Sequence, residues 1–316
     1  MKNFISADDV ADIDALVKLA LELKSNPYAH QDLGKNKIMG LIFFNPSLRT
    51  RLSTQKAATN LGMSVMAMNF DREGWALETE EGVVMDGNKA EHMKEGAAVI
   101  GQYCDIIGVR SFPGLTDREK DYQDIIIKGF AKYSGVPVVN LESAVVHPLQ
   151  SLTDLVTIEE LKKAERPKVV LSWAPHVKSL PQAVPNSFAQ WMNRVNIDFV
   201  ITHPPGYELA SQYAAEAKIE YNQDEAFKGA DFIYAKNWSS YQNYGKILNR
   251  EASWTISKEK MSLTNNAKFM HCLPVRRNLV VNDEVIDSEN SVVIQQAGNR
   301  LYAAQAVLKI LLDKIK

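Results

Sequence analysis

Residues 38–53 read IMGLIFFNPSLRTRLS, an apolar run followed by a proline and two arginines. The run at 38–44 has the length and apolar character of a parallel strand that is buried on both faces. Pro46 disfavours a helical conformation in the residue before it, and Ser47 can cap a helix that begins at Thr50. The stretch therefore predicts a buried strand, a turn and a helix, which is the repeating unit of doubly wound α/β folds.

The same alternation continues along the chain. Further strands are predicted at 64–69, 105–110, 136–141, 168–173, 198–202, 231–236, 268–272 and 291–296. Helices are predicted at 8–24, 50–61, 90–103, 120–133, 151–164 and 299–315. Alternating strands and helices favour parallel sheets that are covered on both faces. With a boundary near 143–150, the pattern predicts an α/β protein of two doubly wound parallel-sheet domains, with an active-site cleft between them.

The composition excludes several classes of function. The chain has 316 residues, 46% of them hydrophobic, which is enough for two domains with separate cores. The net charge of -2 gives no strong field to attract nucleic acid or an acidic membrane. Cys104 and Cys272 lie far apart, so neither a disulfide framework nor a cysteine-rich zinc site is expected. No apolar stretch approaches the roughly 18 residues of a membrane span, and no signal-peptide core is recognisable, so the predicted location is the cytoplasm.

Polar residues gather where the predicted strands end. They are Arg110, Glu142, His147, Gln150, His176, Lys236, His271 and Arg276, with Arg277 next to the last. A single histidine is more often structural than functional, and arginines at a helix start are often a solvated face. So many polar residues at strand ends nevertheless favour a site, because ligands bind at this edge of a parallel sheet. The set holds cations and no acidic pair, which argues against a two-carboxylate hydrolase and a carboxylate magnesium cage.

Several common ligand motifs are missing from the sequence. No GxGxxG follows the first strand, no GxxxxGK[ST] occurs, and no GxSxG elbow is found. His271 and Cys272 are adjacent, which is not the spacing of zinc ligands. The turn at 47–51 instead combines a helix start with two guanidinium groups, which suits an anion such as phosphate. These patterns argue against a dinucleotide, a Walker-type ATP site, a zinc site and a serine hydrolase, and favour an anion-binding site.

Three motifs occur in order along the chain: SLRTR at 47–51, HPLQ at 147–150 with Asp154 shortly after it, and HCLP at 271–274. Together they resemble the aspartate and ornithine carbamoyltransferase family, and the resemblance covers essentially the whole chain. It implies transfer of a carbamoyl group from carbamoyl phosphate to an amine, without a metal or cofactor.

The resemblance also implies an architecture and a partner. Residues 1–146 would bind carbamoyl phosphate, residues 147–298 would bind the amino-acid substrate, and a C-terminal helix at 299–316 would return to the first domain. The protein would self-associate as a homotrimer with shared active sites. A loop at 70–90 would reach the neighbouring subunit's site and present Trp75 to carbamoyl phosphate.

Matching the motifs residue by residue assigns the carbamoyl phosphate site. The implied binding residues are Ser47, Leu48, Arg49, Thr50, Arg51, Trp75, Arg110, His147, Gln150, Cys272, Leu273 and Arg300. Four of them are implied to be catalytic. Thr50, Arg110 and His147 would stabilise the oxyanion of the tetrahedral intermediate. Cys272 would accept a hydrogen bond from the carbamoyl nitrogen through its main-chain carbonyl.

The second substrate is where the chain departs from ornithine and aspartate enzymes. Residues 231–241 read DFIYAKNWSSY, with Lys236 where ornithine enzymes begin an Asp-x-x-x-Ser-Met-Gly segment. These departures match the branch that uses Nα-acylated ornithine. Acylation removes the α-ammonium charge, so cations for carboxylates are needed in place of an acidic partner. The implied acylornithine-binding residues are Glu142, His176, Lys178, Lys236, Arg276 and Ala90.

Ala90 decides the predicted acyl group. Acetyl-using members of this branch carry a glutamate here, whereas succinyl-using members carry an uncharged residue that does not repel a succinyl carboxylate. The predicted reaction is therefore carbamoylation of N-succinylornithine in arginine biosynthesis. N-acetylornithine and then ornithine are the alternative substrates, and a non-catalytic anion-binding relative is the alternative from another class. Alanine also suits the start of a helix, so Ala90 has a purely structural explanation as well.

Overall fold

The computed structural model describes residues 1–315, except for the side chain of Asp71. The chain divides into two compact units. The first consists of Met1–Gly114, Glu119–Leu149 and the residues from Arg300 onward, and the second consists of Leu115–Arg118 and Gln150–Asn299. No helix among the described residues is both long and apolar enough to cross a membrane.

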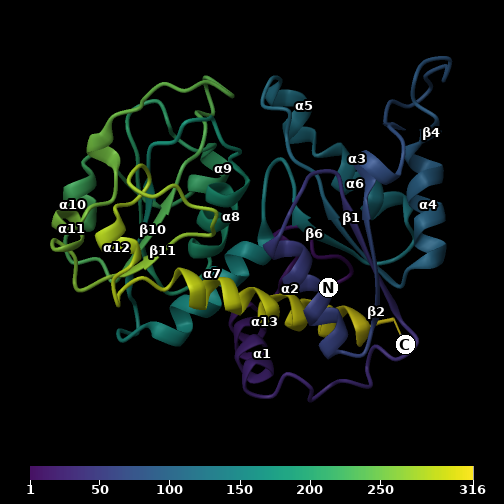
Figure 1. Ribbon diagram of the computed structural model, residues 1–316, viewed down its shortest axis with the longest axis horizontal. Coiled ribbons are helices and arrows are strands. Elements are labelled where there is room, and N and C mark those ends of the chain that lie inside the picture. Colours follow the sequence, from purple (N-terminus) through teal and green to yellow (C-terminus); the bar gives the residue numbers. More distant parts are fainter. Residues whose placement is uncertain (316) are drawn as a thin grey trace. The chain divides into compact units, whose positions relative to one another are not determined.

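The first unit is built on a four-stranded parallel sheet (Figure 1). Its strands are β1 (Ile38–Phe43), β2 (Ser64–Asn69), β5 (Ile106–Arg110) and β6 (Val138–Glu142), in the order β2-β1-β5-β6. All residues of β5 and β6 are buried, as expected for parallel strands that are covered on both faces. A short pair, β3 (Leu77–Glu78) and β4 (Glu91–His92), lies outside this sheet.

The following helices belong wholly or mostly to the first unit. They are η1 (Ala7–Asp9), α1 (Ile13–Ser25), α2 (Arg49–Asn60), α3 (Phe70–Glu73), α4 (Met93–Tyr103), α5 (Arg118–Gln123), α6 (Ile125–Tyr133) and α13 (Val293–Leu312). Helices α4 and α6 contribute Ala97 and Phe130 to a core with Ile107 of β5. Helix α13, the long yellow helix of Figure 1, lies beside α2, and a buried hydrogen bond of 3.1 Å joins Asn60 to Gln305.

The second unit is built on a five-stranded parallel sheet. Its strands are β7 (Lys168–Trp173), β8 (Asp198–Thr202), β9 (Lys218–Glu220), β10 (Phe232–Lys236) and β11 (Lys268–Met270), in the order β11-β10-β7-β8-β9. Its helices are α7 (Pro148–Leu161), α8 (Ala183–Met192), α9 (Ser211–Ala214), α10 (Gln223–Phe227), η2 (Ala252–Trp254), α11 (Lys258–Met261) and α12 (Asp283–Ile286). The predicted α/β fold of two doubly wound parallel domains is thus confirmed, whereas the predicted cleft between them stays a prediction.

One predicted strand is wrong. Only Ser291 makes a single β-bridge, to Phe269, and α13 already begins at Val293. Val292, Val293 and Gln296 are buried while Ile294 is 76% exposed, a spacing that fits a helix face. Packing has therefore overridden the strand preference of the Val-Val-Ile run.

Several helix boundaries and caps also differ from the predictions. The helix predicted at 120–133 is broken into α5 and α6, because Asp124 adopts a left-handed conformation with φ of 54°. Ser47 does not cap α2: Leu48 occupies the N-cap position, without a side-chain cap. The C-terminal helix was predicted to reach 316, but α13 ends at Leu312, and residue 316 lies outside the described residues.

Candidate active site

The centre of the predicted phosphate turn is tied to the C-terminal helix. Thr50 is the second residue of α2 and is only 2% exposed. Its Oγ1 accepts a hydrogen bond of 2.6 Å from Nη2 of Arg300, which α13 supplies. The buried guanidinium of Arg300 therefore lies at the amino end of α2, where the helix dipole also favours an anion.

A second group of predicted residues lies at the carboxyl ends of β5 and β6. Arg110 ends β5 and Glu142 ends β6, and the two buried side chains form an ion pair. His147 follows shortly after, with Nε2 3.6 Å from Oε2 of Glu142. The Arg110 guanidinium also stacks on the ring of Phe112, 4.3 Å from its centroid. We call Arg110, Glu142 and His147 the Arg110 cluster.

The electrostatics of the Arg110 cluster favour a neutral imidazole. Burial is the main cause that lowers the pKa of His147 well below its usual range, and the charges of Arg300 and Arg110 lower it further. A neutral His147 is able to donate a hydrogen bond from one ring nitrogen and accept one at the other.

The Arg110 cluster also holds buried polar atoms that have no hydrogen-bond partner among the residues the structure describes. They are Nε of Arg110 and Nδ1 of His147. Unpartnered polar atoms in a protein interior are uncommon and call for an explanation. A polar ligand would satisfy such atoms, which fits the predicted role of these residues in binding carbamoyl phosphate.

The other residues of the phosphate turn are less buried than Thr50. Ser47, Arg49 and Arg51 are partly exposed, and Leu48 is 67% exposed. The side chain of Arg51 donates to Oδ1 of Asn69 at 2.6 Å and lies 4.7 Å from the ring centroid of Phe43. The turn thus sits at the surface of its unit, where a ligand can reach its guanidinium groups.

Trp75 and Ala90 lie in a separate loop of the first unit. The indole Nε1 of Trp75 donates to Oε2 of Glu91 at 2.9 Å, and the side chain is 56% exposed. Ala90 is exposed next to Glu91, at the start of β4. Lys89 pairs with Glu78 at 2.9 Å, so the base of the loop is anchored. Trp75 and Ala90 thus belong to the loop, and the structure does not bring them into contact with the Arg110 cluster among the residues it describes.

In the second unit, Gln150 is held by a carboxylate to which the sequence analysis gave no role. Nε2 of Gln150 donates to Oδ1 of Asp154 at 2.6 Å. Nε2 of Gln296 donates to the same oxygen, also at 2.6 Å, and Asp154 is fully buried. The spacing of Gln150 and Asp154, four residues apart on one helix, was the available signal for this pairing.

The HCLP turn follows β11 and has an unusual backbone. Leu273 has a left-handed φ of 55°, and its N–H donates to Nδ1 of His271 at 2.8 Å. The N–H of His271 in turn donates to Oε1 of Gln296 at 2.9 Å. The main chain around Cys272 is therefore fixed by side chains, which suits the predicted role of its carbonyl as a hydrogen-bond acceptor.

Four of the residues predicted to bind acylornithine come together in the second unit: His176, Lys178, Lys236 and Arg276. The Nε of Arg276 donates to Nε2 of His176 at 3.2 Å. Arginine only donates, so Nε2 must be the accepting nitrogen and the ring proton sits on Nδ1. Nδ1 therefore donates to the carbonyl oxygen of Lys178 at 3.0 Å, and the backbone nitrogen of Lys178, 3.1 Å away, is only a contact in this tautomer.

The charge around His176 is positive. Burial is the main cause that lowers its pKa, and the charges of Lys236, Arg276 and Lys178 lower it further, partly opposed by the bond to the Lys178 carbonyl. Among residues 1–315 without Asp71, no group of three or more His, Cys, Asp and Glu side chains is arranged to hold a metal ion. The group of four residues suits a carboxylate ligand.

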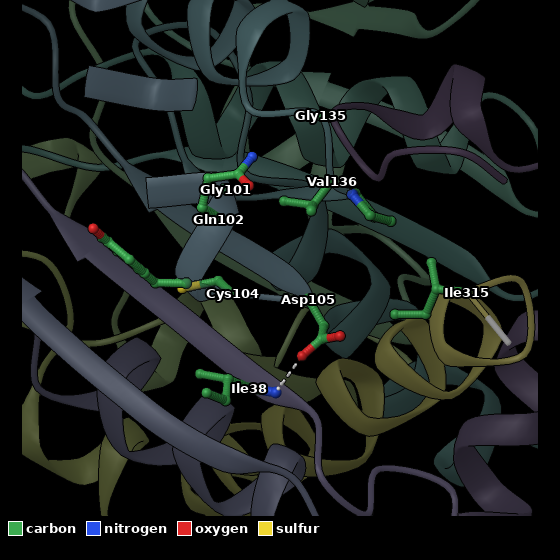
Figure 2. Close-up of a pocket in the computed structure, with 10 residues that line it drawn as sticks. Ile38, Gly101, Gln102, Cys104, Asp105, Gly135, Val136 and Ile315 are labelled. Atoms are coloured by element: carbon green, nitrogen blue, oxygen red, sulfur yellow. Dashed lines mark hydrogen bonds between the residues drawn. The ribbon is translucent and has the colours of Figure 1, made fainter. Parts of the chain in front are cut away.

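A cavity of about 420 Å³ in the first unit lies at the edge of its sheet opposite to the ends of β5 and β6 that carry Arg110 and Glu142 (Figure 2). It is lined by the amino ends of the sheet and the loops before them, including Ile38, Asp105 and Pro137. Figure 2 shows the carboxylate of Asp105 bonded to the N–H of Ile38, at 2.8 Å. Because the predicted site residues lie at the opposite, carboxyl ends of the strands, this cavity is not part of the candidate site.

Comparisons with known proteins agree with these motifs. The family model for the carbamoyl-P binding domain of aspartate/ornithine carbamoyltransferase matches residues 2–160, and the model for its Asp/Orn binding domain matches residues 181–311. N-succinylornithine carbamoyltransferase of Bacteroides thetaiotaomicron is 56% identical over 100% of both chains. N-acetylornithine carbamoyltransferase of Xanthomonas campestris is 37% identical over 99% of this chain and 98% of the relative.

A solved structure of a carbamoyltransferase is also similar to this chain. An N-acetyl-L-ornithine transcarbamylase with one glutamate replaced by alanine, complexed with carbamyl phosphate and N-succinyl-L-norvaline, has a TM-score of 0.91 and 36% identity. The match covers 98% of this chain and 100% of that one. The chain therefore belongs to the aspartate/ornithine carbamoyltransferase family of transferase enzymes.

Proposed function

We propose that the protein transfers the carbamoyl group of carbamoyl phosphate to the δ-amine of N-succinylornithine, giving N-succinylcitrulline and phosphate, in arginine biosynthesis. The observation that carries the proposal is full-length identity of 56% and 54% to two Bacteroides proteins named N-succinylornithine carbamoyltransferase. Relatives named for N-acetylornithine are 36–37% identical and those named for catabolic ornithine carbamoyltransferase 29–31%. Identity therefore falls in the order succinyl, acetyl, unmodified ornithine.

We assign carbamoyl phosphate to the first unit. Arg49, Arg51 and Arg300 supply positive charge beside the amino end of α2, where phosphate is favoured. Arg110 and His147 of the Arg110 cluster would receive the carbamoyl group, because Nε of Arg110 and Nδ1 of His147 call for a polar ligand. Glu142 of the same cluster would orient the δ-amine of the acylornithine.

We assign the acylornithine to the second unit. Its two carboxylates need cations, and Lys178, Lys236 and Arg276 lie around His176. Lys236 ends β10 and is only 8% exposed, so a carboxylate ligand would relieve the cost of keeping this ammonium group largely out of water.

The succinyl group is assigned through Ala90. Structures of N-acetyl-L-ornithine transcarbamylase with one glutamate replaced by alanine, valine, proline or serine are complexes with N-succinyl-L-norvaline. We infer that this glutamate is the family position held here by Ala90. An uncharged, small side chain there leaves space for a succinyl group and adds no charge against its terminal carboxylate.

The mechanism follows from these assignments. The neutral δ-amine attacks the carbamoyl carbon, and a tetrahedral intermediate with an oxyanion forms. Arg110, His147 and Thr50 stabilise this oxyanion by hydrogen bonds and charge. The C–O bond to phosphate then breaks, and the leaving phosphate takes up the proton that the attacking nitrogen loses. The guanidinium groups of Arg49 and Arg51 stabilise this leaving phosphate. Holding the two substrates in register supplies much of the rate.

We also propose assembly as a homotrimer in the cytoplasm. The first unit exposes large apolar side chains on α2 and on β2: Leu52 is 56% exposed and Met66 is 53% exposed. The loop that carries Trp75 and Ala90 also exposes Val84, at 77%. Apolar surface of this kind often marks a protein interface. Light scattering of the purified protein would test the trimer, and cell fractionation would test the location.

One assay tests the proposed reaction. The purified enzyme is incubated with carbamoyl phosphate and either N-succinylornithine, N-acetylornithine or ornithine, and the citrulline product is measured. We expect the highest kcat/KM with N-succinylornithine. The Arg110→Ala variant, purified in the same way, is the control for contaminating activity. Equal or greater kcat/KM with N-acetylornithine would contradict the succinyl assignment, and no product from any substrate would contradict the reaction itself.

A further inference from the structure

Arg277, the residue that follows Arg276, is part of a fixed turn in the second unit. After the HCLP motif, the N–H of Val280 donates to the carbonyl of Arg276 at 2.9 Å, and the N–H of Asn278 donates to the carbonyl of Val281 at 2.7 Å. Asn278 has a left-handed φ of 57°, which closes the turn. Val280 and Val281 are buried in the core of the unit, so one side of the turn is anchored.

The exposed side of the turn is held by Arg277. Nη1 of Arg277 donates to Oδ1 of Asp283 at 2.8 Å, and its Nη1 and Nη2 both donate to the carboxylate of Asp287 at 2.6 Å. Asp283 also accepts from the side chain of Asn278 at 2.8 Å. Asp283 begins α12 and Asp287 caps its end, so Arg277 ties the turn to both ends of that helix.

Isolated surface ion pairs contribute little to stability, but this arrangement is a bidentate pair within a network. Such a fork fixes direction as well as distance, which a lysine cannot do. The direction in which the turn presents Arg276, the neighbouring residue, matters because its side chain is exposed. Its hydrogen bond to His176 depends on that direction.

We propose that Arg277 is a positioning residue: through Asp283 and Asp287 it fixes the turn at 276–281 and thereby holds the Arg276 guanidinium against His176, ready for a carboxylate of the acylornithine. The proposal rests on the proposed function. Arg277 does not touch the substrate, because its guanidinium is engaged with the two carboxylates. Loss of the clamp leaves Arg276 present but free to turn away.

The test is steady-state kinetics of Arg277→Gln and, separately, of Asp287→Asn. Both are expected to raise the KM for N-succinylornithine about five- to tenfold while the KM for carbamoyl phosphate changes less than twofold. Arg277→Lys keeps the charge but loses the forked contact. Its KM for N-succinylornithine should therefore lie between that of Arg277→Gln and that of the natural enzyme. Arg166→Gln, at another exposed arginine of the same unit, is the matched control and should change neither KM.

The outcomes separate the competing explanations. A lower melting temperature with both KM values unchanged would show a purely structural clamp and overturn the proposal. A defect in Arg277→Gln but none in Asp287→Asn would mean that Arg277 acts on the substrate directly, which also overturns it. If Arg277→Gln does not fold, the Asp287→Asn and Arg277→Lys variants decide. Failure of the natural enzyme to use N-succinylornithine would instead contradict the proposed function.

Discussion

The side chains of Arg300 and Thr50 are joined by a hydrogen bond of 2.6 Å across 250 positions of sequence. Both are buried, with exposed fractions of 6% and 2%. The bond connects α13 to the first turn of α2, so the C-terminal helix takes part in shaping the predicted phosphate turn.

Replacing Thr50 by valine is expected to destabilise the protein. Valine keeps the shape of threonine but removes the oxygen that accepts a hydrogen bond from Arg300. The buried Nη2 of the charged Arg300 guanidinium then loses this partner. Such a loss costs about 1–3 kcal/mol of the free energy of unfolding. Urea denaturation measures it. Thr59→Val on the same helix is the control, because its exposed hydroxyl only bonds the carbonyl of Gln55. Equal effects of the two changes would contradict a special role for the buried bond.

Arg49→Ala should impair catalysis without unfolding the protein. Arg49 is partly exposed at the start of α2 and is not part of a core. Loss of a charge-assisted contact to phosphate is expected to cost roughly 2–4 kcal/mol of transition-state stabilisation, about 30- to 900-fold in kcat/KM. Kinetics with a circular dichroism check would measure this. Lys56→Ala, a cation later in α2, is the control, and near-normal activity of Arg49→Ala would refute the phosphate-turn assignment.

Stability is expected to fall in acid partly because of His147. Its pKa in the folded protein is held well below 6.5 by burial and by Arg300 and Arg110. Above pH 6.5 the imidazole is neutral in both the folded and the unfolded protein, so it does not change the free energy of unfolding. Below it the unfolded chain binds a proton that the folded protein does not, which costs up to about 1.4 kcal/mol per pH unit.

His147→Gln removes this titrating group, so its free energy of unfolding should fall less between pH 7 and pH 5 than that of the natural protein. Urea denaturation at several pH values compares the two chains. The difference between them isolates His147 from His176, whose pKa is also lowered by burial. Parallel curves for the two proteins would show that His147 does not contribute.

Most strands of the two large sheets were predictable because their sequences are short apolar runs that end at polar residues, whereas the three-residue β9 was not predicted. KVVLSW, at 168–173, coincides with β7, and 64–69 coincides with β2. The run at 291–296 has a similar composition but became the start of α13, because burial of Val293 and Gln296 on one helix face decided its structure. Local composition does not contain that packing information. The break at Asp124 is equally hidden, since no glycine or proline marks it.

The sequence indicated that some of the predicted site residues lie close together, but it did not indicate their individual pairings. Polar side chains at strand ends identified Arg110, Glu142 and His147, which the structure brings together. The bond between Arg300 and Thr50 depends on where α13 packs, and no local pattern encodes it.

Shared active sites can be tested by mixing two inactive variants. If Trp75 acts in a neighbouring subunit's site, as the family resemblance implies, a hybrid of Trp75→Ala and Arg110→Ala subunits contains sites in which both residues are intact. Partial activity should return after the subunits exchange. Arg110→Ala mixed with His147→Ala is the control, because both residues belong to one cluster of one chain, and it should stay inactive. No recovery in the first mixture, after exchange is verified, would mean that each chain builds its own site.

Ala90→Glu is expected to change the preferred acyl group. A carboxylate at this exposed position would repel the terminal carboxylate of a succinyl group and occupy its space, whereas an acetyl group has no charge to repel. The kcat/KM for N-succinylornithine should therefore fall at least tenfold relative to that for N-acetylornithine. Asn88→Glu places the same charge two residues away in the same exposed loop and serves as the control. If the two variants change the ratio equally, general charge in the loop is responsible and Ala90 does not select the acyl group. An unchanged ratio in Ala90→Glu would also contradict the assignment, because repulsion between two neighbouring carboxylates must weaken succinyl binding if they share a pocket.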